Sequence, residues 1–367
     1  MNNRYPAAPA VTHTFKAFAT LRRMAILVLL VVSLWACKDD EQAPKGKFEH
    51  GALVINEGAF GGGNGSITYY NTTTGMAEQN IYRNVIGKFA GDVTQSLTIH
   101  DDKAYIVLNG DNKIEIADAN TFERLGTISD DAIVQPRYLE VVGNYAYLTV
   151  QGEYDANYNL VESSVLVIDL STNKVIKKLE TDKGVENIVH AGNYLFASNY
   201  YYGQSSTVTV IDPATNAFVK YVDVASGPSG MAVDVNGKLW VISQGDESSV
   251  LTRINPSTFE KETTIDLGLS ADTDLAITPD KSSLIYYTSG RVYKIAITAT
   301  TAPSTPFFTI ADLGYEYALG VDPENGDIWV GDAPTFTADG KVFIYGADGK
   351  SKTTFTSGIG PTNFVFK

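Results

Sequence analysis

The chain has 367 residues, of which 28 are Lys or Arg and 42 are Asp or Glu, so its formal charge is −14. At roughly 100–200 residues per domain, this length allows two or three ordinary domains or one large domain built from repeats. Hydrophobic residues make up 44% of the chain, which excludes disorder as the general class. An acidic surface repels phosphate backbones, so we expect no nucleic-acid partner. The single cysteine excludes an intramolecular disulfide and a cysteine-rich zinc site.

Residues 1–36 have the pattern of an export signal. Arg22 and Arg23 precede an apolar run over residues 25–36, interrupted only by Ser33. This run is shorter than the about 20 residues that cross a membrane, but it matches the apolar region of a signal peptide. The run ends directly before Cys37 and resembles a bacterial lipobox, which implies cleavage at Cys37 and acylation of its thiol. The alternative is a buried structural thiol that happens to follow an export signal.

Residues 37–51 are expected to form a tether between the lipid anchor and the folded domain. Lys38, Asp39 and Asp40 follow the cysteine and resemble the surface-export signal of Bacteroidota lipoproteins. The alternative is a charged, solvated linker without a sorting role. The resemblance implies an outer-membrane protein that is exposed at the cell surface and held by its lipid alone.

Residues 52–367 contain one unit repeated with a period of about 45 residues. Each unit has four short, alternating apolar segments separated by Gly, Asn or Asp turns, and none has a sustained helical period. The third segment ends in Asp or Asn with Thr three residues later; its clearest copies are residues 116–121, 167–172, 210–215 and 253–258. Four strands per repeat predict an all-β, seven-bladed β-propeller.

The two ends of the repeat region predict how the ring closes. Residues 52–56 match the second strand of other units, so the first unit lacks its own first strand. Residues 360–366 match a first strand, as a comparison with residues 227–233 indicates. The C-terminal strand is therefore expected to complete blade one and leave no free edge in the ring.

The Gly-Pro first strands and the Val-Ile-Asp third strands resemble those of YVTN-type, surface-layer β-propellers. Residues 56–67, with their glycine-rich stretch, resemble the opening of Bacteroidota surface lipoproteins with this fold. The resemblance spans residues 52–367. It implies capture of a large nutrient such as cobalamin and its transfer to a TonB-dependent outer-membrane transporter. An adhesive or protein-contact scaffold is a further alternative, because propellers host unrelated activities.

A ligand is expected on the upper face, defined as the face with the loops between second and third strands. Four of these loops are long and carry aromatic residues, which is where a binding site is expected. The candidate ligand-binding residues are Phe60, Tyr154, Tyr158, Tyr200, Tyr201, Tyr202 and Phe336, together with Asp246. The alternatives are that the tyrosines pack between loops, and that Gly-Asp pairs such as Gly245-Asp246 only form turns.

An enzyme is the second choice, in the form of a calcium-dependent lactonase. Such a site needs carboxylates that converge on the axis, and Glu186 and Asp274 lie near the first strands of their blades. Their spacing is not diagnostic, and the chain lacks the motifs of serine hydrolases and c-type haem attachment. We therefore expect no catalysis and no cofactor, with structural calcium as the possible exception.

Overall fold

The computed structural model describes residues 1–2 and 44–367. Cys37, Lys38, Asp39 and Asp40 lie outside the described residues, so the expected lipidation and export signals stay predictions. Residues 45–367 form one compact unit, the propeller. Within the described residues, no helix is both long and apolar enough to cross a membrane.

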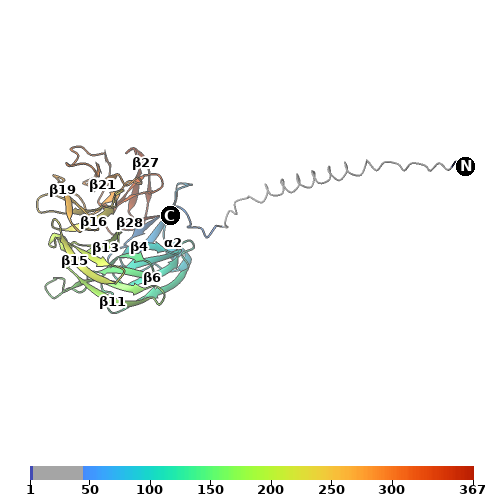
Figure 1. The fold of residues 1–367 in the computed structure, drawn as a ribbon, viewed down its shortest axis with the longest axis horizontal. Helices are drawn as coiled ribbons and strands as arrows, with labels where there is room; N and C mark the ends of the chain where they lie inside the picture. Colours follow the sequence, from blue (N-terminus) through green and yellow to red (C-terminus); the bar gives the residue numbers. More distant parts are fainter. Residues whose placement is uncertain (3–43) are drawn as a thin grey trace. The chain divides into compact units, whose positions relative to one another are not determined.

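In this unit the strands form seven four-stranded antiparallel sheets, as the repeat predicts. The first strands of the seven blades contact one another in a closed ring around the axis (Figure 1). From blade one to blade seven, these inner strands are β28 (Pro361–Phe366), β4 (Thr94–His100), β8 (Pro136–Val142), β12 (Val185–Ala191), β16 (Pro228–Val233), β20 (Ala276–Ile277) and β24 (Glu316–Val321).

The second strand of each blade is almost completely buried, because adjacent blades cover both of its faces. These strands are β1 (Ala52–Asn56), β5 (Lys103–Leu108), β9 (Tyr145–Val150), β13 (Tyr194–Asn199), β17 (Leu239–Ser243), β21 (Ser283–Thr288) and β25 (Ile328–Asp332). In β1, for example, Leu53 and Ile55 pack towards blade two, whereas Ala52 and Val54 pack towards blade seven. Alternation along the strands thus divides the core into seven apolar layers between neighbouring blades.

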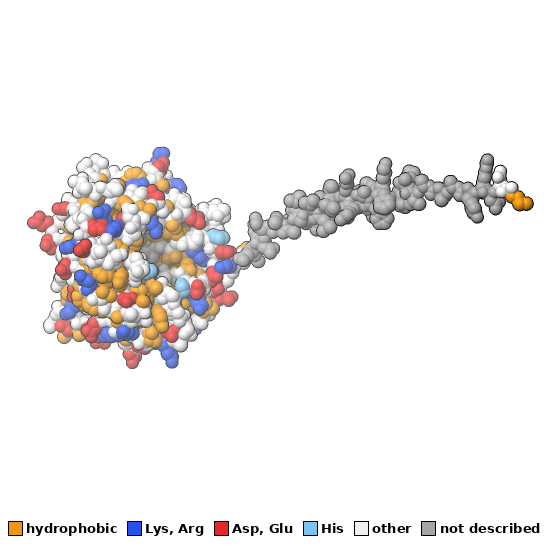
Figure 2. Space-filling view, in the orientation of Figure 1, with side chains coloured by type: hydrophobic (Ala, Val, Ile, Leu, Met, Phe, Trp, Pro, Cys, Tyr) orange, Lys and Arg blue, Asp and Glu red, His pale blue; other side chains and the backbone are white. Residues whose placement is uncertain are grey.

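The third and fourth strands continue each blade outward. The third strands are β2 (Ser66–Asn71), β6 (Lys113–Asp118), β10 (Ser163–Asp169), β14 (Thr207–Asp212), β18 (Val250–Ile254), β22 (Arg291–Ala296) and β26 (Lys341–Tyr345). The outer strands are β3 (Met76–Glu78), β7 (Arg124–Ile128), β11 (Lys174–Thr181), β15 (Ala217–Asp223), β19 (Lys261–Asp266), β23 (Phe308–Thr309) and β27 (Ser351–Thr356). Figure 2 shows one face of the propeller, where acidic and basic side chains are interspersed with apolar ones.

The C-terminal strand closes the ring as predicted. β28 pairs with β1 in an antiparallel register, with Ala52 opposite Phe366 and Val54 opposite Phe364. Both phenylalanine rings also pack edge-on against Trp329 of blade seven, at centroid distances of 5.7 Å for Phe364 and 5.3 Å for Phe366. The last strand therefore connects the first blade to the last.

Two local features differ from the sequence-based expectation. Residues 45–51, expected at the end of the tether, pack on the propeller, where Phe48 is 3% exposed and lies 5.1 Å from the ring of Tyr69. A short helix, α2 (Ile81–Ile86), lies between blades one and two and buries Ile81 and Tyr82. Six residues are too few to produce a detectable helical period in the sequence.

Candidate functional site

The candidate site is a cavity of about 490 Å³ at the upper end of the axis. Every blade contributes to its wall. The lining residues are Thr362, Gln95, Arg137, Tyr138, Glu186, Asn187, Ser229, Asp272, Thr273, Asp274, Tyr315 and Tyr317 from the inner-strand starts and the segments before them, with Glu57, Gln151, Tyr200 and Tyr202 from the second-to-third loops.

Irregular strand starts direct these side chains to the axis. In six of the seven blades, all but the one with β20, the pairing of the inner strand shifts within its first residues. A shift of this kind leaves one or two residues without a partner on the neighbouring strand and re-aims their side chains. Thr362, Gln95, Arg137, Glu186 and Tyr317 all lie at such shifts and line the cavity.

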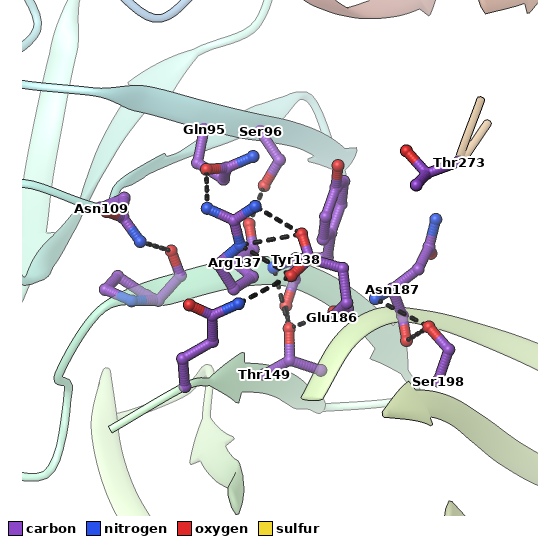
Figure 3. Close-up of polar contacts among 12 residues, drawn as sticks. Gln95, Ser96, Asn109, Arg137, Tyr138, Thr149, Glu186, Asn187, Ser198 and Thr273 are labelled. Carbon is purple, nitrogen blue, oxygen red and sulfur yellow. Dashed lines mark hydrogen bonds and ion pairs between the residues drawn. The ribbon is translucent and has the colours of Figure 1, made fainter. Parts of the chain in front are cut away.

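An ion pair between Arg137 and Glu186 forms one wall (Figure 3). The guanidinium Nε lies 2.8 Å from Oε1 and 3.0 Å from Oε2 of Glu186, and Nη2 lies 2.5 Å from Oε1. Gln151 donates a further hydrogen bond to Glu186 Oε2 at 2.9 Å, and Arg137 Nη1 donates to the side-chain oxygen of Gln95. Burial alone would lower the pKa of Arg137, but the charge and hydrogen bonds of Glu186 outweigh it and raise that pKa. The pair is therefore charged and held in one geometry.

A second wall is acidic and has no cation of its own. Asp274 Oδ2 accepts hydrogen bonds from the backbone N–H of Leu319 at 3.0 Å and from the Tyr287 hydroxyl at 3.3 Å. Asp272 accepts from the backbone N–H of Thr273 at 2.6 Å. Burial, reinforced by the charge of Asp272, raises the pKa of Asp274 to about 7. Burial also raises the pKa of Asp272.

Tyrosines from several blades form the remaining wall. The Tyr317 hydroxyl donates to Glu57 Oε2 at 2.7 Å, and burial raises the pKa of Glu57. Tyr200 and Tyr202 come from the loop after β13, where Tyr201 and Tyr202 have positive φ angles of 37° and 51°. Such angles are costly for a tyrosine, and residues of this kind cluster at functional sites.

The structure brings together only some of the residues predicted for the site. Tyr200 and Tyr202 line the cavity, as do Glu186 and Asp274, which were considered as calcium ligands. Tyr154 does not line the cavity but contacts a residue that does, since its hydroxyl lies 3.0 Å from that of Tyr202.

Phe336 also lies behind the wall, with its ring packed edge-on against Tyr317 at 4.8 Å and Tyr315 at 5.6 Å. Tyr201, Phe60, Tyr158 and Asp246 are not part of the lining. The Phe60 and Tyr158 side chains are 91% and 87% exposed, and Asp246 accepts a hydrogen bond from Ser226 at 2.7 Å.

The site also contains residues that the sequence analysis missed, chiefly Arg137, Tyr138, Gln95, Asp272 and Tyr317. A signal for Arg137 was present: it follows Pro136 just as Thr362 follows Pro361 and Ser229 follows Pro228, so the three occupy equivalent positions. For calcium, residues 44–367 contain no group of three or more His, Cys, Asp or Glu side chains arranged to hold a metal ion. Both carboxylate oxygens of Glu186 are instead engaged by Arg137 and Gln151.

The fold and this cavity define a seven-bladed β-propeller with a polar axial pocket. A family model described as a domain of unknown function (DUF5074) matches residues 50–354, and the chain belongs to this family. No curated protein matches the chain.

Solved structures share the fold at low sequence identity. A quinoprotein alcohol dehydrogenase-like protein from Bacteroides thetaiotaomicron is 15% identical, with a TM-score of 0.66 over 88% of this chain and 79% of that one. A functionally unknown protein from Desulfotomaculum acetoxidans is 10% identical, with a TM-score of 0.66 over 86% of this chain and 98% of that one. Hydrazine synthase from Kuenenia stuttgartiensis is 15% identical, with a TM-score of 0.56 over 73% and 87% of the two chains. These similarities establish the fold alone.

Proposed function

We propose that this protein is a lipid-anchored surface protein that binds a nutrient ligand in the axial pocket and transfers it to a TonB-dependent outer-membrane transporter. The observation that carries the binding role is the convergence of polar side chains from all seven blades on one cavity of about 490 Å³. A few polar groups placed in a concave site are the usual basis of orientation and specificity.

The composition of the wall favours binding over catalysis. The charges of Arg137 and Glu186 are paired with each other and held by Gln95 and Gln151, an arrangement that suits the orientation of a ligand better than a reaction. A calcium-dependent lactonase needs several carboxylates that converge on the ion, and Glu186, one of the two candidate ligands, is paired with Arg137 instead. The tyrosines add flat contact area at a low cost in side-chain entropy.

The resemblance of the repeats and of the N-terminal signal makes a cobalamin-like molecule the first ligand to test. In this proposal, one polar arm of such a ligand enters the axial pocket. The exposed aromatic side chains of Phe60 and Tyr202 on the upper-face loops offer contact area for the rest.

The experiment is calorimetric titration of the purified protein with cyanocobalamin. We expect binding that weakens by on the order of 1–4 kcal/mol when Tyr200 and Tyr202 are both replaced by Ala, because both line the pocket. Tyr158→Ala is the matched control, since this tyrosine lies on the same face but outside the pocket, and its replacement should leave the affinity unchanged.

The enzyme alternative is tested in parallel by a lactone-hydrolysis assay with calcium and with chelator. Chelator-sensitive hydrolysis in the absence of ligand binding would overturn the proposal. Equal losses of affinity in Tyr158→Ala and in the Tyr200/Tyr202 variant would place the ligand outside the axial pocket.

A further inference from the structure

The acidic wall of the pocket is formed by three neighbouring side chains, which we call the acidic arc: Ser229, Asp272 and Asp274. The backbone N–H of Gly230 donates to the carbonyl of Thr273 at 2.8 Å, which holds the start of β16 against the segment before β20. This contact requires glycine, because a Cβ at position 230 would lie 2.6 Å from the Thr273 oxygen and 2.6 Å from the Leu275 nitrogen. Ser229 therefore lies beside the two aspartates.

The two carboxylates of the arc lack a positive partner. No Lys or Arg among residues 44–367 lies within ion-pair distance of Asp272 or Asp274. The only cation in the pocket wall, Arg137, is committed to Glu186 and Gln95. Each aspartate also keeps one oxygen, Asp274 Oδ1 and Asp272 Oδ2, to which no described residue donates a hydrogen bond. Buried carboxylates are normally paired, so this arrangement leaves room for a cation from outside the chain.

Ser229 contributes a hydrogen-bonding group beside the two aspartates. Its residue is only 8% exposed and lines the cavity. Its hydroxyl makes no hydrogen bond to any described residue. Because Ser229 lines the cavity and no described residue bonds its hydroxyl, this hydroxyl can form a hydrogen bond with a ligand atom.

Two tyrosines supply aromatic rings to the same cavity. Tyr200 and Tyr315 both line it, and the charge of Asp272 contributes to the raised pKa of Tyr200, for which burial is the main cause. Tyrosine faces attract cations, and the attraction is stronger where the cation is partly desolvated.

We propose that the acidic arc binds a protonated amine of the ligand, with Asp272 and Asp274 as charge partners, Ser229 as a hydrogen-bonding group, and Tyr200 and Tyr315 as the aromatic rings. This inference rests on the proposed binding function of the same pocket but not on cobalamin as the ligand, because cyanocobalamin carries amide side chains and no protonated amine. The Arg137–Glu186 pair lies in blades three and four, whereas the arc lies in the adjoining blades five and six, so the amine is bound next to the ion pair and not at it.

The test compares three probes that share an aromatic body and differ in the head group: tyramine, N-acetyltyramine and 3-(4-hydroxyphenyl)propionate. Each is titrated into the purified protein by calorimetry. We expect tyramine to bind. The affinities of the neutral and the anionic probe should be lower by on the order of tenfold or more, because a hydrogen bond between charged groups contributes more than one between neutral groups.

The variants Asp272→Asn, Asp274→Asn and Ser229→Ala should each weaken tyramine binding. Asp246→Asn is the matched control, because this aspartate lies on the same face, outside the pocket, and should leave binding unchanged. Circular dichroism identifies any variant that fails to fold, and the two remaining arc variants then carry the test.

The outcomes separate this inference from the proposed function. If cyanocobalamin binds through Tyr200 and Tyr202 but tyramine binds no better than the propionate, the amine assignment is wrong and the binding function stands. If tyramine binds equally well to the wild-type protein and to the Asp272 and Asp274 variants, the acidic arc is not its site and the inference is also overturned. If no ligand or probe binds the pocket, both proposals fail.

Discussion

Arg137 and Glu186 are the residues whose energetics depend most on each other. Their side chains are 23% and 11% exposed, so neither charge is well solvated. Removal of one partner leaves the other charge buried and unpaired, which costs far more than the pair itself contributes. Replacement of both partners by apolar residues of similar size avoids that cost.

We therefore predict that Glu186→Ala destabilises the propeller by roughly 3 kcal/mol, because it leaves the Arg137 guanidinium buried without a charge partner. The double variant Arg137→Met/Glu186→Leu should be more stable than Glu186→Ala. Urea denaturation of the three proteins measures the free energies of unfolding. A double variant that is less stable than the single one would show that the two side chains are not coupled in this way.

Asp274 gives a second prediction at the residue scale, which concerns pH. Burial and the charge of Asp272 raise its pKa to about 7, and Glu186 adds to the rise while Leu319 N–H and Tyr287 oppose it. In the unfolded chain the pKa of an aspartate is about 3.9. Between these values the native state binds more protons than the unfolded state, so this group's contribution to stability falls as the pH rises from about 4 to about 7.

Asp274→Asn should remove the loss of stability that the ionisation of Asp274 causes as the pH rises. Between pH 5 and pH 8, the unfolding free energy of the wild-type protein should fall by about 1–2 kcal/mol more than that of the variant. This figure is reduced for the solvent access that the cavity gives the carboxyl group. Urea denaturation at both pH values measures the difference, with Asp246→Asn as the exposed control. A wild-type-like pH dependence in Asp274→Asn would contradict the assignment.

Among the elements, the inner strands both close the ring and form the pocket. The strands contact one another around the axis, and the irregular first residues of six of them line the pocket. A change that distorts a strand start therefore acts on ligand binding, whereas a change in the paired half acts on the closure of the ring.

β28 allows closure to be tested. Deletion of residues 361–367 removes the partner of β1 and the two phenylalanines that pack on Trp329, and it exposes strand edges. We predict a loss of several kcal/mol in unfolding free energy or aggregation.

A milder variant keeps the test informative if the truncated protein does not fold. Phe364→Ala with Phe366→Ala should lower the melting temperature clearly, whereas Phe60→Ala, which removes a ring that is 91% exposed, should not. Thermal unfolding followed by circular dichroism compares the two, and equal melting temperatures would refute the role of β28 in closure.

At the scale of the whole molecule, the proposed biology depends on where the propeller is held. The described unit begins at Lys45, so an acylated Cys37 would leave a tether of only seven residues before the folded domain. One acyl chain gives weak membrane binding and stable anchoring needs more than one, which the lipid modification of bacterial lipoproteins would have to supply.

The corresponding prediction is that Cys37→Ser releases the protein from membranes or leaves its signal peptide uncleaved. Membrane fractionation and the mass of the mature chain measure the two effects. Normal maturation together with unchanged membrane association in the variant would reject the lipid anchor.

Much of the fold could be predicted because it is encoded locally and repeated. The alternation of apolar residues, the turn residues and the period of about 45 residues each recur along the chain, and the incomplete first unit predicted that β28 pairs with β1. The packing of Phe48 and the helix α2 could not be predicted in this way, since neither belongs to the repeat.

The site was predicted only in part, for a physical reason. The sequence by itself determined seven similar blades and indicated that the upper face carries tyrosine-rich loops, because strand alternation and turn chemistry depend on neighbouring residues. Which side chains meet was decided by ring closure and by the register shifts that turn Arg137, Glu186 and Tyr317 towards the axis. Glu57 and Tyr317 are 260 residues apart in the chain and share a hydrogen bond of 2.7 Å. No local pattern encodes such a contact, because it exists only once the last strand has joined the first blade.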